Sequence, residues 1–224
     1  MRSKGLRTAI SVFGALAALA VSTPLMAQAS CDLATLQDIA DRYDKAQAEG
    51  SMFQLPVGEW VDYRENLTMS SSATGVLSQP MDFAWTAQLL DTQQCQVFVK
   101  GVITEPKGYV LATVVNNGFF GVNQVSTVVG REGAAEVLAQ ASGEDWSELP
   151  EGARAGRAQL IAAANTYLDG LGKEIVERSF VVDDAKGGVG VFARLGESSG
   201  PAASYTLRIE DGAVRDAHES VSAE

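Results

Sequence analysis

The chain has 224 residues, 46% of them hydrophobic, and a formal net charge of −11. This length suits one or two small domains. The excess of acidic residues argues against binding to nucleic acid or anionic membranes, because both need clustered lysine and arginine.

The first 29 residues have the pattern of a secretory signal peptide. Residues 1–7 are basic without an acid, residues 9–22 are apolar, and Ala27-Gln28-Ala29 has the small-x-small form of a cleavage site. The apolar run is too short for a confident transmembrane helix. We therefore expect a secreted or periplasmic protein, cleaved near Ala29, with no membrane association afterwards.

Two cysteines follow the predicted cleavage site, Cys31 and Cys95. In an oxidising compartment a lone pair of cysteines is most simply a disulfide. The alternative is a lipoprotein acylated at Cys31, but Gln28 occupies a position where an aliphatic residue is expected. The single histidine, His218, gives no zinc spacing and is expected at the surface. We expect no metal and no cofactor.

Two amphipathic helices are predicted, at 34–46 and 158–170, with Gly50 and Gly172 as their stops. Between them, residues 59–67 alternate as a strand, 68–80 form a polar loop, and 82–90 form a second strand. In that second strand Phe83, Trp85, Ala87 and Leu89 are expected on one face. Residues 141–156 have the composition of a linker.

The motifs VITEPKG (102–108) and VVDDAKG (181–187) indicate an internal repeat with an offset of 79 residues. The two helices align with an offset of 124, so the first copy would carry about 45 extra residues, roughly 50–95. This predicts a complete unit at 30–140, a linker at 141–156 and a reduced helix-plus-meander unit at 157–224. The alternative is one continuous α+β domain with coincidental similarity.

Three segments, CDLATLQDIADRYDKA, LPVGEWVDYRENL and RAQLIAAANTYLDGL, resemble a secreted two-unit relative of the SnoaL-like, ketosteroid-isomerase-like cone superfamily, found in bacteria and fungi and without known function. The resemblance implies an α+β, cystatin-like cone in which a curved antiparallel sheet wraps a helix around an apolar pocket. It also implies a homodimer through the outer sheet face. The second unit departs from the pattern, because no segment matches VDYRENL there.

Enzymes with this cone fold use a carboxylate base and a hydrogen-bond donor. The candidate bases are Asp62, Glu65 and Asp82, and the candidate ligand-binding residues are Tyr63, Trp85, Phe98 and Tyr109. The simpler alternative is that the acids face solvent and the aromatic residues belong to the core.

Three functions remain open. The first is binding of a small apolar or aromatic molecule in the pocket of the first unit. The second is a cofactor-independent lyase, isomerase or dehydratase that uses a pocket carboxylate. The third is a protein-interaction module that docks through its sheet face. The sequence holds no phosphate-binding loop and no G-x-S-x-G nucleophile motif.

Overall fold

The computed structural model describes residues 31–131 and 133–222. The predicted signal peptide lies outside these residues. The α-helices are α1 (Leu33–Glu49), α2 (Ala134–Ala141) and α3 (Arg157–Gly170), and short 3₁₀ turns span Met52–Gln54, Val76–Ser78 and Glu151–Ala153. The strands are β1 (Val57–Glu65), β2 (Thr68–Met69), β3 (Trp85–Asp91), β4 (Gln96–Ile103), β5 (Tyr109–Gly118), β6 (Gly121–Gly130), β7 (Ile175–Asp183), β8 (Gly188–Leu195), β9 (Ala202–Glu210) and β10 (Ala213–Val221).

The strands form two sheets, which confirms the predicted α+β class. Sheet A has six strands in the order β2-β1-β6-β5-β4-β3, and sheet B has four in the order β10-β9-β8-β7. Sheet B is antiparallel throughout, whereas β1 runs parallel to β6. The expectation of an antiparallel sheet was therefore wrong at β1. The chain leaves β1 at one side of sheet A, crosses to the far edge and returns through β3, β4, β5 and β6, so that β6 reaches β1 in the same direction.

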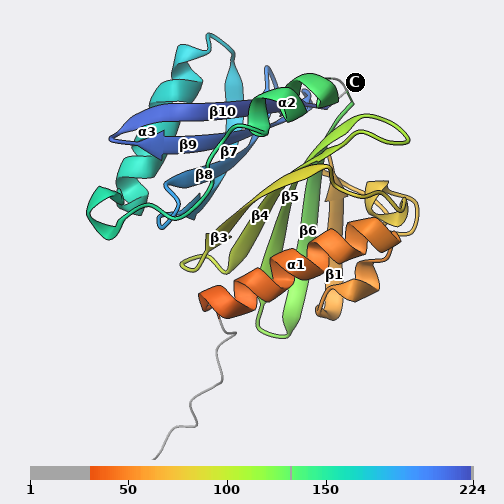
Figure 1. Cartoon of the computed structure of the whole chain (residues 1–224). Helices are drawn as coiled ribbons and strands as arrows, with labels where there is room; N and C mark the ends of the chain where they lie inside the picture. The colour runs from red at the N-terminus through yellow and green to blue at the C-terminus, as the bar shows by residue number, and fades with distance from the viewer. Residues whose placement is uncertain (1–30, 132, 223–224) are drawn as a thin grey trace, which may run out of the picture.

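The layers follow one another as α1, sheet A, sheet B and α3 (Figure 1). Helix α1 buries Leu36, Ile39 and Tyr43 against sheet A, and α3 buries Leu160 and Leu168 against sheet B. The inner faces of the two sheets pack on each other. No helix among the described residues is long and apolar enough to cross a membrane.

Helix α1 begins one residue before its predicted start and ends just before Gly50, its predicted stop. The carboxylate of Asp32 accepts a hydrogen bond from the Thr35 amide at 2.8 Å, which caps the first turn. Gly50 takes the left-handed conformation, with φ 65°, and its amide closes the last turn. Helix α3 ends at Gly170, and Gly172, the predicted stop, is left-handed just beyond it.

Two features near sheet A differ from the prediction. Phe83 precedes β3 and packs toward α1, 6.1 Å from the ring of Tyr43, whereas Trp85 and Leu89 face the other side of sheet A. The strand begins only at Trp85, so the alternation does not extend back to Phe83. Helix α2 was not predicted; its Ala134 packs on Val102 and Val110.

The two sheets interlock through glycines of β8. A Cβ atom at Gly188 would lie 2.3 Å from the side chain of Leu89, and one at Gly190 would lie 2.5 Å from the ring of Phe98. Both partners are fully buried, and Phe98 also packs edge-on against Phe192 at 6.0 Å. The two glycines of β8, which have no side chain, therefore make room for the large side chains of Leu89 and Phe98 in sheet A.

Replacing Gly190 by alanine should lower the free energy of unfolding by about 1–3 kcal/mol, because the buried Phe98 ring cannot move away without disturbing its neighbours. Urea denaturation measures this change. Gly143→Ala is the matched control, since nothing lies within 4 Å of its added Cβ. An equal effect at both positions would show that the sheets do not interlock here.

Two buried aspartates, one in each sheet, accept hydrogen bonds from backbone amides of the other sheet. The Val182 amide donates to Asp91 at 2.9 Å, and the Leu90 amide donates to Asp183 at 3.0 Å. Both carboxylates are at most 2% exposed. Arg157 Nη1 also donates to Asp91, at 2.6 Å, and so supplies a positive charge to the carboxylate. Each sheet thus satisfies backbone groups of the other.

Candidate functional site

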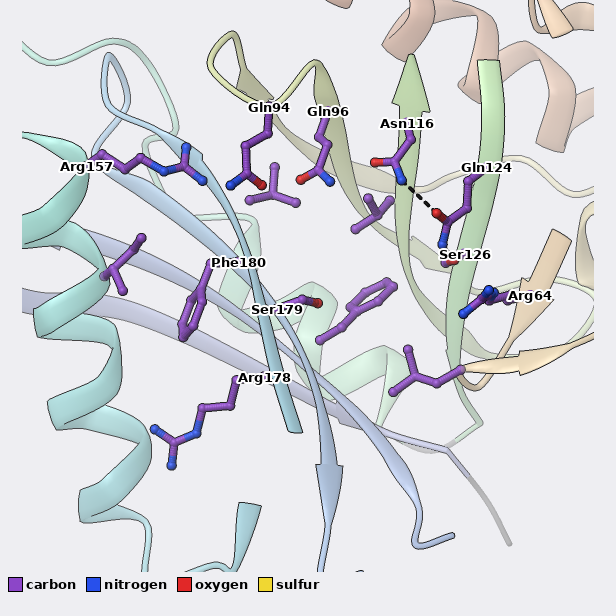
Figure 2. A pocket seen from close by; sticks show the side chains of 15 residues that line it. Arg64, Gln94, Gln96, Asn116, Gln124, Ser126, Arg157, Arg178, Ser179 and Phe180 are labelled. Carbon is purple, nitrogen blue, oxygen red and sulfur yellow. Dashed lines mark hydrogen bonds between the residues drawn. The ribbon is translucent and has the colours of Figure 1, made fainter. Parts of the chain in front are cut away.

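A cleft of about 500 Å³ opens between sheet A, sheet B and α3 (Figure 2). Its polar lining residues are Arg64, Gln94, Gln96, Asn116, Gln124, Ser126, Arg157, Arg178 and Ser179. Its apolar lining residues are Leu67, Val114, Ile161, Phe180, Val181 and Phe192. The cleft lies on the face of sheet A opposite α1, beyond the part that sheet B covers closely.

The floor of the cleft is a row of amide side chains on adjacent strands. Gln96, Asn116 and Gln124 are direct cross-strand neighbours on β4, β5 and β6. Asn116 Nδ2 donates to Gln124 Oε1 at 2.8 Å, and Gln124 Nε2 donates to Ser126 Oγ at 2.9 Å. Neighbouring side chains on one sheet face lie within contact distance, so these amides form a continuous polar surface.

Three arginines stand around this row, and each is bound to a carboxylate. Arg64 lies 2.5 Å from Asp62, Arg157 lies 2.6 Å from Asp91, and Arg178 lies 2.6 Å from Asp169. Figure 2 shows Arg157 and Arg64 at opposite ends of the amide row, with Arg178 on the facing side. Each guanidinium charge is therefore largely compensated within the protein.

Two polar atoms of the lining have no hydrogen-bond partner among the described residues. They are Arg157 Nη2, a donor, and Asn116 Oδ1, an acceptor, and both are buried. Asp62 Oδ1 is also buried without a hydrogen-bond partner among the described residues, and Asp62 lies directly opposite Gln124 where β1 pairs with β6. Buried polar atoms are normally satisfied, because leaving one unpaired costs about 1–3 kcal/mol. Two of the seven such atoms among the described residues belong to this lining and a third, on Asp62, lies beside it, which marks the cleft as the candidate site.

Two smaller depressions lie near the cleft. One of about 230 Å³ shares Arg64, Arg178 and Phe192 with it and adds Glu177 and Arg194. The next, of about 380 Å³, shares Arg194 and reaches Ser199 and Ser222. Arg194 is paired with Glu177 at 3.4 Å. The main cleft and the first of these hollows therefore form one groove, and Arg194, which donates to the carbonyls of Leu67 and Gly200, stands between this groove and the other hollow.

The residues proposed from sequence are not gathered at this cleft. Asp62 reaches it only through its pairing with Arg64. Asp82 lines a separate open hollow of about 590 Å³ near Phe83 and Glu105. Trp85 packs beside α2, 5.9 Å from His218, and Phe98 is buried between the sheets.

Glu65 and Tyr63 do lie together. The Tyr63 hydroxyl donates to Glu65 Oε1 at 2.6 Å, and the Val76 amide donates to the same oxygen. The Leu77 amide donates to the Tyr63 hydroxyl at 3.3 Å. Burial, followed by the bond to Glu65, raises the pKa of Tyr63 well above its usual value. The pair holds the segment around Val76 against sheet A.

The remaining candidates belong to the packed core. Tyr109 is 8% exposed and packs in a cluster with Met81, Ile103 and Val129. The space between α1 and sheet A, where the resemblance places an apolar pocket, is occupied by fully buried side chains that include Tyr43. The Tyr43 hydroxyl is hydrogen-bonded to Thr113 Oγ1 at 2.6 Å.

His218 is not a surface residue, contrary to the sequence-based expectation. It is 2% exposed, and its Nε2 lies 2.8 Å from Glu144 Oε2. The prediction was wrong because β10 directs the His218 side chain toward sheet A, where the segment after α2 covers it. Among the described residues, no group of three or more His, Cys, Asp or Glu side chains is placed to hold a metal ion.

The residues that line the cleft were missed, although the sequence carries a signal for them. Amides are concentrated at 93–96, 116–117 and 123–124, where β4, β5 and β6 meet at one end of the sheet. No family model matches this chain, and neither a curated protein nor a solved structure matches it.

Proposed function

We propose that this protein binds a small polar molecule in the cleft between its two sheets. The observation that carries the proposal is the pair of unpartnered buried atoms, Arg157 Nη2 and Asn116 Oδ1, on residues from different units that line one cleft. A bound molecule that accepts from one and donates to the other would remove the cost of leaving them unpaired. The volume of the cleft falls in the ordinary range for small-molecule sites, about 300–1,000 Å³.

This proposal changes the ligand expected from sequence. A small apolar or aromatic molecule suits a hydrophobic pocket, but the cleft floor is made of amides and arginines. An apolar ligand there would cover polar groups without pairing them, which is unfavourable. The lyase or isomerase alternative rests on Glu65 and Tyr63, whose hydrogen bonds are directed at each other and at the Val76 segment.

We also propose that residues 30–140 form the cone-like unit and that the chain contains a repeat, with a different register from the one inferred from sequence. VITEPKG lies between β4 and β5, whereas VVDDAKG lies between β7 and β8. Strands β3, β4, β5 and β6 end at residues 91, 103, 118 and 130. The corresponding strands β7, β8, β9 and β10 end 92, 92, 92 and 91 residues later, so the offset between the two sets is nearly constant. Cys95 and Gly187, 92 residues apart, both have positive φ. This register pairs LLDTQQC with VVDDAKG.

In this arrangement sheet B takes the place that a second subunit would occupy in the predicted homodimer. It packs on the face of sheet A opposite α1 through Phe192 and Val181. The internal partner therefore supports a monomer with a built-in second unit. The disulfide between Cys31 and Cys95 supports secretion, either to the medium or to the periplasm.

Asn116→Ala tests the binding site directly. A screen of polar solutes by thermal shift should find compounds that raise the melting temperature of the wild-type protein, because a ligand that binds only the folded state stabilises it. The shift should be lost or strongly reduced in Asn116→Ala and kept in Asn123→Ala. Asn123 is an exposed amide on β6 that does not line the cleft. Equal shifts in both variants would place the ligand elsewhere and contradict the proposal.

A further inference from the structure

We infer that the ligand of the cleft is a short neutral saccharide, an inference that rests on the binding function proposed above. Four features of the groove support it. They are the compensation of its charges, the mixture of donors and acceptors along its floor, its apolar lining residues and its length.

The charges of the groove argue against an ionic ligand. Arg64, Arg157 and Arg178 are each within 2.6 Å of their own carboxylate partner. An anion would have to compete with these carboxylates at short distance, in a chain whose net charge is −11. A cation would meet three guanidinium groups. A neutral molecule avoids both costs.

The floor offers donors and acceptors in alternation. Each amide of Gln96, Asn116 and Gln124 carries an acceptor oxygen and an NH₂ donor, and a ligand hydroxyl can donate once and accept twice. Of the two unpartnered atoms, Arg157 Nη2 needs an acceptor and Asn116 Oδ1 needs a donor. A molecule with many hydroxyl groups meets both needs, whereas a hydrocarbon or an aromatic ring meets neither.

Apolar side chains in the lining suit the C–H faces of sugar rings. Val181 and Phe192 line the cleft on the side of sheet B that packs on sheet A, and the half-buried ring of Phe180 lines it on the other side of β7, toward α3 (Figure 2). A pyranose ring presents apolar C–H groups on its faces and hydroxyl groups around its edge. Apolar walls with a few polar groups are the usual composition of small-molecule sites, and the lining of this cleft combines both kinds of surface.

The length of the groove favours more than one ring. The main cleft of about 500 Å³ adjoins the hollow of about 230 Å³, with which it shares Arg64, Arg178 and Ser179. Ser179 adds a hydroxyl group along this path, and Arg194, which donates to the carbonyls of Leu67 and Gly200, stands between it and the hollow of about 380 Å³. A linear oligosaccharide could place successive rings in successive hollows, while a single small solute would fill only the first.

The test is a glycan array of neutral and acidic oligosaccharides, followed by calorimetric titration of the best binder. Citrate and 2-naphthol serve as anionic and aromatic probes. We expect a neutral oligosaccharide to bind and Asn116→Ala and Gln124→Ala each to weaken it about tenfold, the effect of losing one or two hydrogen bonds. Asn123→Ala should bind as the wild type does. Phe180→Ala should also weaken binding, whereas Phe119→Ala, at an exposed position outside the groove, should not.

The outcomes separate the two proposals. Binding of only citrate, acidic glycans or 2-naphthol, with loss of that binding in Asn116→Ala, would overturn the saccharide inference and leave the cleft as a binding site. Binding of a neutral glycan that Asn116→Ala and Gln124→Ala do not affect would overturn the assignment of saccharide to this groove. If no probe and no polar solute binds, both proposals are wrong. Near-identical circular dichroism spectra of the variants would confirm that they fold.

Discussion

Replacing Lys100 by methionine should remove most of the dependence of stability on pH between about pH 7 and 10. Lys100 is fully buried between the sheets, and burial lowers its pKa to about 7, only partly opposed by Glu219. Its ammonium group donates to Ser220 Oγ at 2.5 Å and lies 3.5 Å from Ser204 Oγ. No carboxylate forms an ion pair with it among the described residues.

The direction follows from proton binding in the two states. Between pH 7 and the ordinary lysine pKa near 10.5, the unfolded chain keeps the proton while folded Lys100 gives it up. The wild-type protein should therefore gain stability as pH rises through this window, by roughly 4 kcal/mol, and show no further change from this residue below about pH 6. Lys100→Met should lack this gain and be more stable than the wild type at pH 7.

Urea denaturation at several pH values measures the effect. Lys107→Met is the matched control, because Lys107 is exposed in the turn between β4 and β5. We expect its stability to follow the wild-type profile. If Lys100→Met and the wild type rise in parallel between pH 7 and 10, Lys100 is not buried as a neutral amine between the sheets.

The second large effect concerns the disulfide between Cys31 and Cys95, which is confirmed and leaves no Cys31 thiol for a lipid. It joins the start of α1 to the turn between β3 and β4 and closes a loop with a sequence separation of 64. A cross-link of this span restricts the unfolded chain by about 4 kcal/mol in the chain-entropy model. The Cys31→Ser/Cys95→Ser double variant should be less stable by about this amount.

Denaturation of the double variant beside the wild type, each with and without reductant, checks this prediction. Reductant should bring the wild type close to the variant and leave the variant unchanged. A difference below about 1 kcal/mol would mean that the bond restricts the unfolded chain far less than its span suggests. Mass spectrometry of the purified protein should find the two cysteines without added groups.

The parts of the fold set by local patterns could be predicted from the sequence. The stripe of Leu36, Ile39 and Tyr43, the stop at Gly50 and the alternation around Tyr63 depend on residues a few positions apart. The parallel pairing of β1 with β6 could not be predicted this way, since it joins segments about 60 residues apart whose own patterns fit either direction. His218 shows the same limit, because its burial depends on the segment that covers β10.

The candidate site was harder to predict, because it exists only where the two sheets meet. Arg157 comes from α3, Asn116 from sheet A and Phe180 from sheet B. Each is unremarkable in its own segment. The candidates predicted from sequence were acids and aromatic residues, most of them within 50–95, whereas the cleft is built mainly from amides and arginines outside that range. The docking of the sheets, through Gly188 and Gly190, is what brings these residues together.

The most direct test of the central claim is an NMR titration that follows side-chain NH₂ signals with the tightest ligand found. We predict that the signals of Gln96, Asn116 and Gln124 shift together with saturation, because these three amides form the floor of the cleft, while the Asn123 signal stays in place. Shifts confined to other surfaces, with the three cleft amides unchanged at saturation, would contradict a binding site between the sheets.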